Sequence, residues 1–250
     1  MSAHACFRTS GTVFLLLAAV ACQGDRRSNT IPDAAVPEAT TGLPAGWDVR
    51  LDRPGEDPAG VEFRSAEPGY TVRTGPAAIL FNPVLTVSAD YYAVARFIQL
   101  KPTPHGEAYG LFVGGKDLQS VVQSYVYFLI RQDGKFLIKR RIGAETSTIE
   151  DWTDHPAIAR QPDGGDPPEN TLRIDAGPDA VMFSINGEEV ARLPRSDIDV
   201  DGIVGVRVNH GLELAIPHFE VVPQDIPVPE RATQAARSSW RVPPRPATAG

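Results

Sequence analysis

The 250-residue sequence predicts an all-β domain built as a two-sheet antiparallel sandwich. Three observations carry this prediction. Apolar and polar residues alternate with a period of two over many short runs, helical periodicity is nearly absent, and Gly, Pro, Asn and Asp separate the runs. Many short strands of similar length without helices are typical of a sandwich or jelly roll.

The first half of the domain supplies three strand segments. Residues 70–74 alternate cleanly between apolar and polar side chains. Residues 85–100 suit one long strand or two short ones, and residues 109–113 form a run that Gly114 and Gly115 close. Alternation of this kind is expected of strands that bury one face.

The clearest hairpin signal is Asp133-Gly134, which lies between the β-rich runs 124–131 and 135–142. Asp-Gly between two such runs favours a type I′ turn, because that turn needs positive φ at both central residues. The sequence therefore predicts two antiparallel neighbours joined by a two-residue turn.

A two-residue turn would pair Tyr127 with Arg140 and Tyr125 with Ile142 on one face. Tyrosine rings stack on sugar faces and guanidinium groups reach hydroxyls in fixed directions, so Tyr125, Tyr127, Arg131 and Arg140 are candidate ligand-binding residues. An ordinary sandwich face, with arginine stems packed over tyrosine, is the alternative. If the face binds sugar, Tyr127→Ala is expected to weaken binding without unfolding the domain.

The second half of the domain completes the sandwich. Turn residues lie at Gly177-Pro178, Asn186-Gly187 and His210-Gly211, where Gly, Pro and Asn favour tight reversals. The strands expected there are residues 170–176, 180–185, 189–193, 202–209 and 212–222.

The N-terminus predicts export. A short basic start precedes an apolar run over residues 13–21, and small residues lead to Cys22. This resembles a secretory signal peptide ending in a bacterial lipobox, which implies removal of residues 1–21 and lipidation of Cys22. The apolar run is too short to span a bilayer, so we expect a bacterial cell-envelope protein that is anchored through lipid alone. Gln23 follows Cys22, in place of the Asp linked to inner-membrane retention, so we expect the outer membrane, with the domain facing the periplasm or the cell surface.

Three zones follow the signal peptide. Residues 22–42 have few large apolar side chains and are expected to form a flexible tether. Residues 43–222 form the predicted sandwich, and residues 223–250, rich in Pro, Ala and Arg, are expected to form a disordered tail. Cys6 is the only other cysteine, so the exported domain has no thiol for a disulfide or a zinc site.

The charge balance limits the partners. Lys and Arg total 24 against 31 Asp and Glu, a formal charge of −7, and loss of Arg8 makes it more negative. An acidic domain repels nucleic acid phosphates, so no nucleic acid partner is expected. A glycan or small sugar suits this surface better.

Several motifs together resemble a known family. They are Tyr109-Gly-Leu-Phe-Val-Gly-Gly-Lys116, SYVYFLIRQDGKFLIKRR, Trp152-Thr-Asp-His-Pro-Ala157, Asn170-Thr-Leu-Arg-Ile174, Phe183-Ser-Ile-Asn-Gly187 and Asp201-Gly-Ile-Val-Gly-Val-Arg207. Most of residues 43–222 thereby resembles concanavalin A-like jelly rolls, above all bacterial secreted 3-keto-disaccharide hydrolase-like domains, and laminin-G-like modules. The resemblance implies a jelly roll, an architecture that hosts lectins, glycosidases and structural modules alike.

Catalysis has weaker support in the sequence. The Glu-x-Asp-x-x-Glu or Glu-x-Asp-x-Glu run of jelly-roll β-glucanases is absent. If the domain hydrolyses glycosidic bonds, His155, Glu150 and Asp151 are the candidates for acid and base. Trp152 beside them is a candidate sugar platform, and the alternative is a buried tryptophan that anchors a corner.

Two further motifs complete the candidate sites. His210 lies in a turn from which it can contact a ligand, although Asn209-His210-Gly211 is also ordinary turn chemistry. Asp197, Asp199 and Asp201 alternate before Gly202 like the opening of a calcium loop, so Ca²⁺ is a possible ligand, with an acidic turn as the alternative.

The sequence therefore favours an envelope lipoprotein whose jelly roll binds carbohydrate. One alternative is a glycoside hydrolase acting on oxidised (3-keto) disaccharides, as the resemblance implies. The other is a non-catalytic structural or partner-binding envelope module, for which an exposed apolar patch without a small-molecule pocket would be the signature.

Overall fold

The computed structural model describes residues 42–160 and 165–224. The predicted signal peptide, Cys22, nearly all of the tether and most of the tail lie outside the described residues. Within the described ranges, no helix is long and apolar enough to cross a membrane.

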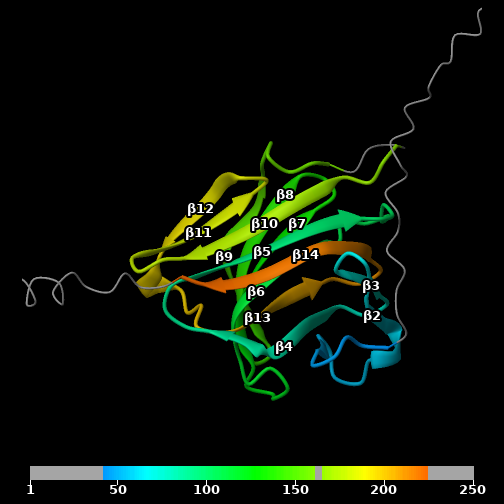
Figure 1. The fold of residues 1–250 in the computed structure, drawn as a ribbon, viewed down its shortest axis with the longest axis horizontal. Coiled ribbons are helices and arrows are strands. Elements are labelled where there is room, and N and C mark those ends of the chain that lie inside the picture. The colour runs from blue at the N-terminus through cyan, green and yellow to red at the C-terminus, as the bar shows by residue number, and fades with distance from the viewer. Residues whose placement is uncertain (1–41, 161–164, 225–250) are drawn as a thin grey trace, which may run out of the picture. The chain divides into compact units, whose positions relative to one another are not determined.

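The described chain forms two seven-stranded antiparallel sheets packed face to face, which confirms the predicted sandwich (Figure 1). Sheet A has the order β1 (Asp48–Leu51), β4 (Ala78–Val87), β13 (Gly202–Val208), β6 (Ala108–Lys116), β7 (Ser124–Arg131), β8 (Lys135–Ile142) and β9 (Glu145–Asp154). Sheet B has the order β12 (Glu188–Pro194), β11 (Ala180–Ile185), β10 (Glu169–Ala176), β5 (Tyr91–Gln99), β14 (Glu213–Pro223), β3 (Tyr70–Thr74) and β2 (Val61–Ser65). Two short 3-10 turns are η1 (Pro58–Gly60) and η2 (Arg195–Asp197).

The main core lies between the sheets and is held by aromatic contacts that cross it. Phe97 of β5 and Tyr109 of β6 have ring centroids 5.4 Å apart, and Phe128 of β7 and Phe183 of β11 have centroids 5.3 Å apart. All four side chains are buried. Each ring removes a large apolar area from water, which is the main driving force for pairing the two sheets.

A second apolar cluster lies on the outer face of sheet A. On β7, Val126 and Phe128 belong to the core between the sheets, whereas Tyr125, Tyr127 and Leu129 belong to this outer cluster, as strand alternation requires. The outer cluster comprises Ile79, Phe81, Ala108, Phe112, Leu118, Tyr125, Tyr127, Leu129 and Leu137. Burial on both faces explains why β7 reads as an unbroken apolar run.

The β7–β8 hairpin forms where Asp133-Gly134 predicts it, but its register differs from the prediction. Three residues rather than two make the turn: Gly134 adopts φ +88°, and its N–H donates to the carbonyl of Arg131 at 3.1 Å. A three-residue turn with glycine in the left-handed region is the next most common hairpin connection.

The longer turn shifts the pairing by one residue. Tyr127 lies opposite Lys139 and Tyr125 opposite Arg141, while Arg140 lies opposite Val126. Because one residue of slip moves a side chain to the other face of a sheet, Arg140 does not share a face with the two tyrosines. The prediction that Tyr125, Tyr127, Arg131 and Arg140 share one face is therefore wrong for Arg140.

Candidate functional site

A cleft of about 820 Å³ opens at one end of sheet A. Its walls come from the segment after β1, the β3–β4 turn, the start of β6 and the β13–β14 turn, which bring distant parts of the sequence together. Figure 1 shows the blue β1 segment beside β4, where this end of the sheet lies. The lining residues are Asp52, Arg53, Glu56, Asp57, Gly60, Gly75, Pro76, Ala77, Glu107, Arg207, Asn209 and His210.

Arg207 is the charged group of the cleft that is fixed by the most contacts. Its guanidinium binds the Asp52 carboxylate in a two-bond fork, with Nη1 to Oδ1 at 2.6 Å and Nη2 to Oδ2 at 2.5 Å. Nη1 also donates to the hydroxyl of Tyr125 at 3.1 Å, and the guanidinium carbon lies 4.8 Å from the centroid of the Tyr127 ring. Only 8% of the side chain is exposed, so the fork is fixed in a nearly dry environment.

Asp52 has a second cationic partner in Arg141. Nη1 of Arg141 lies 3.4 Å from Oδ1 of Asp52, and Nη2 donates to the Asp52 carbonyl at 3.2 Å. Burial by itself would raise the pKa of Asp52, but the hydrogen bond and charge of Arg207, with the charges of Arg141 and Arg53, lower that pKa below its usual value. Asp52 is therefore a fixed anion at the base of the cleft.

His210 and Glu107 form the opposite wall. Nε2 of His210 lies 3.0 Å from Oε1 of Glu107, whose side chain is mostly buried while the imidazole is 63% exposed. The turn beneath them is fixed, because the Asn209 N–H donates to the Ala108 carbonyl at 2.9 Å and the Thr74 hydroxyl donates to the Asn209 carbonyl at 2.6 Å. The imidazole is thus presented to solvent from a rigid base.

The loop after β1 contributes two more carboxylates. Asp57 begins the η1 turn, where its Oδ1 accepts the Ala59 N–H at 2.9 Å. Glu56 is half-buried, and its Oε2 is shielded from solvent with no hydrogen-bond partner among the described residues. The cleft therefore combines donors and acceptors, as a site for a polar ligand requires.

Of the predicted ligand-binding residues, His210 lines this cleft. Tyr125 and Tyr127 do not line it but contact Arg207, which does. Tyr125 is 2% exposed and Tyr127 is 6% exposed, so neither ring is presented to solvent for stacking. Arg207 covers Tyr127 and holds the Tyr125 hydroxyl. The rings place the guanidinium and do not form the predicted open platform.

Trp152 and Arg131 lie together on the outer face of sheet A. The Arg131 guanidinium carbon is 4.4 Å from the centroid of the Trp152 ring, within the range of a cation–π contact. Arg131 also makes a two-bond pair with Asp133, whose pKa is lowered chiefly by that hydrogen bond. The indole is half-buried and packs against the outer cluster, so it is partly the corner anchor that the sequence left as the alternative.

The three candidate acid and base residues have local structural partners. Nδ1 of His155 accepts the Ala157 N–H at 3.2 Å, and its ring lies 6.2 Å from that of Phe136. Glu150 accepts the hydroxyl of Thr153 at 3.2 Å, and Asp151 accepts the backbone N–H that follows it at 2.8 Å. None of the three lines the cleft, and their catalytic roles stay a prediction.

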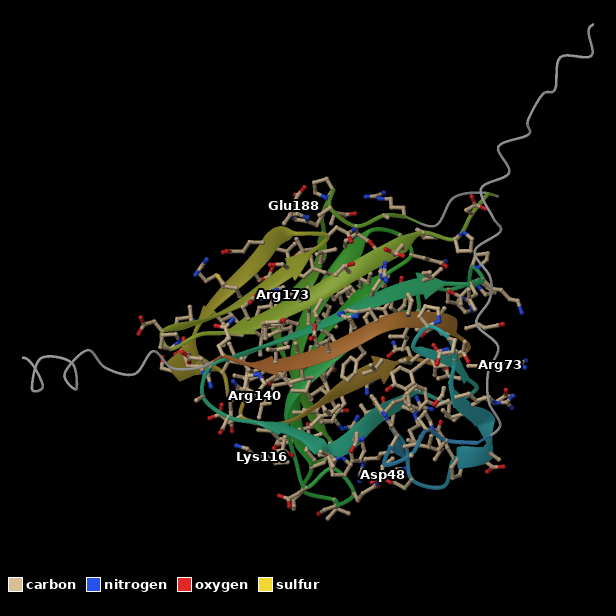
Figure 2. All side chains as sticks on the ribbon, viewed as in Figure 1. Asp48, Arg73, Lys116, Arg140, Arg173 and Glu188 are labelled. Atoms are coloured by element: carbon tan, nitrogen blue, oxygen red, sulfur yellow. The ribbon has the colours of Figure 1, made fainter. Side chains whose placement is uncertain are left out.

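The alternating aspartates lie at the other end of sheet A. A smaller cavity of about 360 Å³ there is lined in part by Tyr125, Arg140, Asp197 and Asp199. Figure 2 shows Arg140 and Lys116 at this end, away from Arg73.

The three aspartates do not converge on one point. Asp199 pairs with Lys116, and Asp201 pairs with Arg195 at 2.5 Å. The carbonyl of Asp197 accepts from Arg140 at 2.6 Å. Among the residues that the structure describes, no group of three or more His, Cys, Asp or Glu side chains is arranged to hold a metal ion, so the alternation does not build the expected calcium loop.

Comparison with solved structures confirms the concanavalin A-like sandwich. A carbohydrate-binding module of family 66 from Bacillus subtilis matches with a TM-score of 0.54 at 11% identity, over 71% of this chain and 95% of the module. A family 16 endo-glucanase from Bacteroides ovatus, in complex with G4G3G-2F-DNP, matches with a TM-score of 0.51 at 12% identity, over 74% of this chain and 99% of the enzyme. No protein-family model matches the sequence, and no curated protein matches it.

Proposed function

We propose that this protein binds carbohydrate, and that the sugar occupies the cleft at the end of sheet A. The observation that carries the proposal is that two pairs of polar side chains, the Asp52–Arg207 ion pair and the Glu107–His210 contact, border one open cavity. Fixed donors and acceptors around a cleft of this size suit a ligand with many hydroxyls, because each hydroxyl both donates and accepts.

The similar sandwiches support the proposal without assigning a ligand. One is a carbohydrate-binding module and another is an endo-glucanase. No Phe, Tyr or Trp is among the described residues that line the cleft, so hydrogen bonds rather than stacking on a large ring would supply the specificity.

We further propose that the domain works outside the cytoplasm, held to the outer membrane by lipid on Cys22. This rests on the sequence pattern of the first 22 residues. A tether after the lipid would keep the cleft accessible to glycans of the envelope or of its surroundings.

His210→Ala tests the site. We expect sugar affinity to fall by about 10-fold, or about 1.4 kcal/mol, because the imidazole is the most exposed polar group of the fixed pair. The melting temperature is expected to stay nearly unchanged for the same reason. Isothermal titration calorimetry of the full chain against a panel of neutral oligosaccharides measures the change.

His218→Ala is the matched control. His218 also lies beside a glutamate, with Nε2 3.5 Å from Oε2 of Glu220, but it belongs to β14 of sheet B and does not line the cleft. Its loss is expected to leave affinity unaltered. Equal weakening by both variants, or none by His210→Ala, would place the sugar elsewhere.

A further inference from the structure

Among the described residues, Glu56 has neither a cationic partner nor a hydrogen-bond donor on its Oε2, whereas Asp57 at least accepts the Ala59 N–H. Asp52 is compensated by Arg207 and Arg141, and Glu107 lies against His210. Among the described residues, no cation lies within ion-pair distance of Glu56, and its Oε2 has no hydrogen-bond donor. A partly buried carboxylate without a compensating cation is unfavourable, and a cationic ligand in the cleft would compensate its charge.

The remaining charges make the cleft acidic. Four carboxylates line it, against the cations Arg53 and Arg207 and the imidazole of His210, which is charged only when protonated. Arg207 is already held by Asp52, and the exposed Arg53 contributes its charge to the same carboxylate. Glu56 and Asp57 therefore leave an uncompensated negative potential on the wall formed by the loop after β1.

From this charge arrangement we propose, resting on the proposed function above, that the cleft selects amino sugars. A free ammonium group on the sugar would donate to Glu56 and compensate its charge in one contact. Charge-assisted hydrogen bonds of this type are roughly twice as strong as neutral ones. A hydroxyl donates without compensating the charge, and the carboxylate of a uronic acid meets repulsion from the same wall.

Little rearrangement is needed for that contact. Glu56 lines the cleft and its side chain is only half-buried, so a ligand in the cleft can contact the carboxylate even though Oε2 is shielded. The loop that carries Glu56 is held at its far end by η1, where the Gly60 N–H donates to the Asp57 carbonyl at 3.0 Å. A ligand can therefore reach the carboxylate while the backbone of this loop stays in place.

The test compares three oligosaccharides with the same β-1,4-linked backbone: cellotetraose, its fully N-acetylated amino counterpart, and the free-amine counterpart. Calorimetry on the full chain at about pH 6, where the amines carry a proton, gives the dissociation constants. We expect the free-amine sugar to bind at least about 10-fold more tightly than either neutral sugar. In Glu56→Gln this preference, taken as the ratio of the neutral-sugar to the free-amine dissociation constant, is expected to fall to about 2-fold or less.

Glu188→Gln is the matched control, since it removes the same charge from an exposed glutamate on β12. Figure 2 shows Glu188 across the molecule from Asp48, which begins the strand that leads to the cleft. The tighter binding of the free-amine sugar is expected to be unchanged by this substitution. If both variants lose it equally, the preference reflects net charge and the assignment to Glu56 is wrong.

The remaining outcomes separate this inference from the proposed function. If neutral sugars bind as tightly as the amine in the unmodified protein, amino-sugar selection is wrong while carbohydrate binding stands. If no oligosaccharide of the panel or of this series binds, carbohydrate binding in the cleft fails and the selectivity fails with it. Amino-sugar selection is decided by the ratio of dissociation constants in the unmodified protein. That ratio can be measured even if the Glu56→Gln variant does not fold.

Discussion

Replacing Asp52 with alanine is expected to lower the free energy of unfolding by about 3–5 kcal/mol, the usual cost of removing one partner of a buried ion pair. The substitution leaves Arg207 with 8% of its side chain exposed and without its only carboxylate among the described residues. Arg141 loses the same partner. Chemical denaturation followed by tryptophan fluorescence measures the loss.

Asp154→Ala is the control for this result. Asp154 also has two cationic partners, with Lys135 at 3.1 Å and Arg160 at 3.3 Å, but 59% of its side chain is exposed. Water screens exposed pairs, so a change of less than about 1 kcal/mol is expected. Comparable losses in the two variants would show that burial of the Asp52 fork contributes nothing.

The same carboxylate gives the fold a defined dependence on pH. The pKa of Asp52 is lowered in the folded protein, so its contribution is fully present above the ordinary value of 3.8. It is lost as the pH falls through the lower folded value. The stability difference between the unmodified protein and Asp52→Ala is therefore expected to shrink below pH 3.8, and a difference that grows on acidification would contradict the assignment.

Tyr127→Ala is expected to destabilise the domain by about 3 kcal/mol, the low end for truncating a buried aromatic side chain. Tyr127 is 6% exposed, its ring centroid lies 5.8 Å from that of Tyr125, and Arg207 covers its face. The substitution leaves a cavity in the outer cluster and removes the support of the guanidinium. Thermal and chemical unfolding together measure the effect.

Lys139→Ala tests whether truncating any side chain on the outer face of sheet A lowers the free energy of unfolding. Lys139 is the cross-strand partner of Tyr127 but is only partly buried, and a loss below about 1 kcal/mol is expected. A Tyr127→Ala protein with unaltered stability and weakened sugar binding would restore the open stacking face that the sequence suggested.

The strand pattern of the sequence predicts the fold well because alternation and turn residues are local. β3 and β7 have the bounds that the pattern predicts, and the Asp133-Gly134 hairpin forms. The one-residue error in register arises because Asp-Gly is compatible with both two- and three-residue turns, and the choice between them depends on packing of both strands.

Three of the four edge strands, β1, β9 and β2, were missed for physical reasons, whereas the edge strand β12 was predicted. β9 (Glu145–Asp154) is a mostly exposed, polar edge strand and therefore lacks an apolar face to detect. β1 and β2 are short edge strands. The start of β4 is a continuous apolar run, buried on both faces, which carries no alternation.

The site was largely hidden because its contacts join remote positions. Asp52 and Arg207 are 155 residues apart. Asp52 lies in no motif, and Arg207 ends the run 201–207 that carries a resemblance of fold without marking a site. His210 was found because a histidine in a tight turn is exposed, but its partner Glu107 carries no local signal. Pairing of β13 with β4 and β6 brings these residues to one end of sheet A, and only the three-dimensional arrangement reveals it.

The most direct test of carbohydrate binding in the cleft is a heteronuclear NMR titration of the full chain with an oligosaccharide that binds it. The largest shifts are expected in the loop 52–60, at Glu107 and over residues 207–210, which together surround the cleft. Shifts confined instead to Trp152 and the β7–β9 part of sheet A would place the sugar on the outer face, and the assignment of the cleft would be wrong.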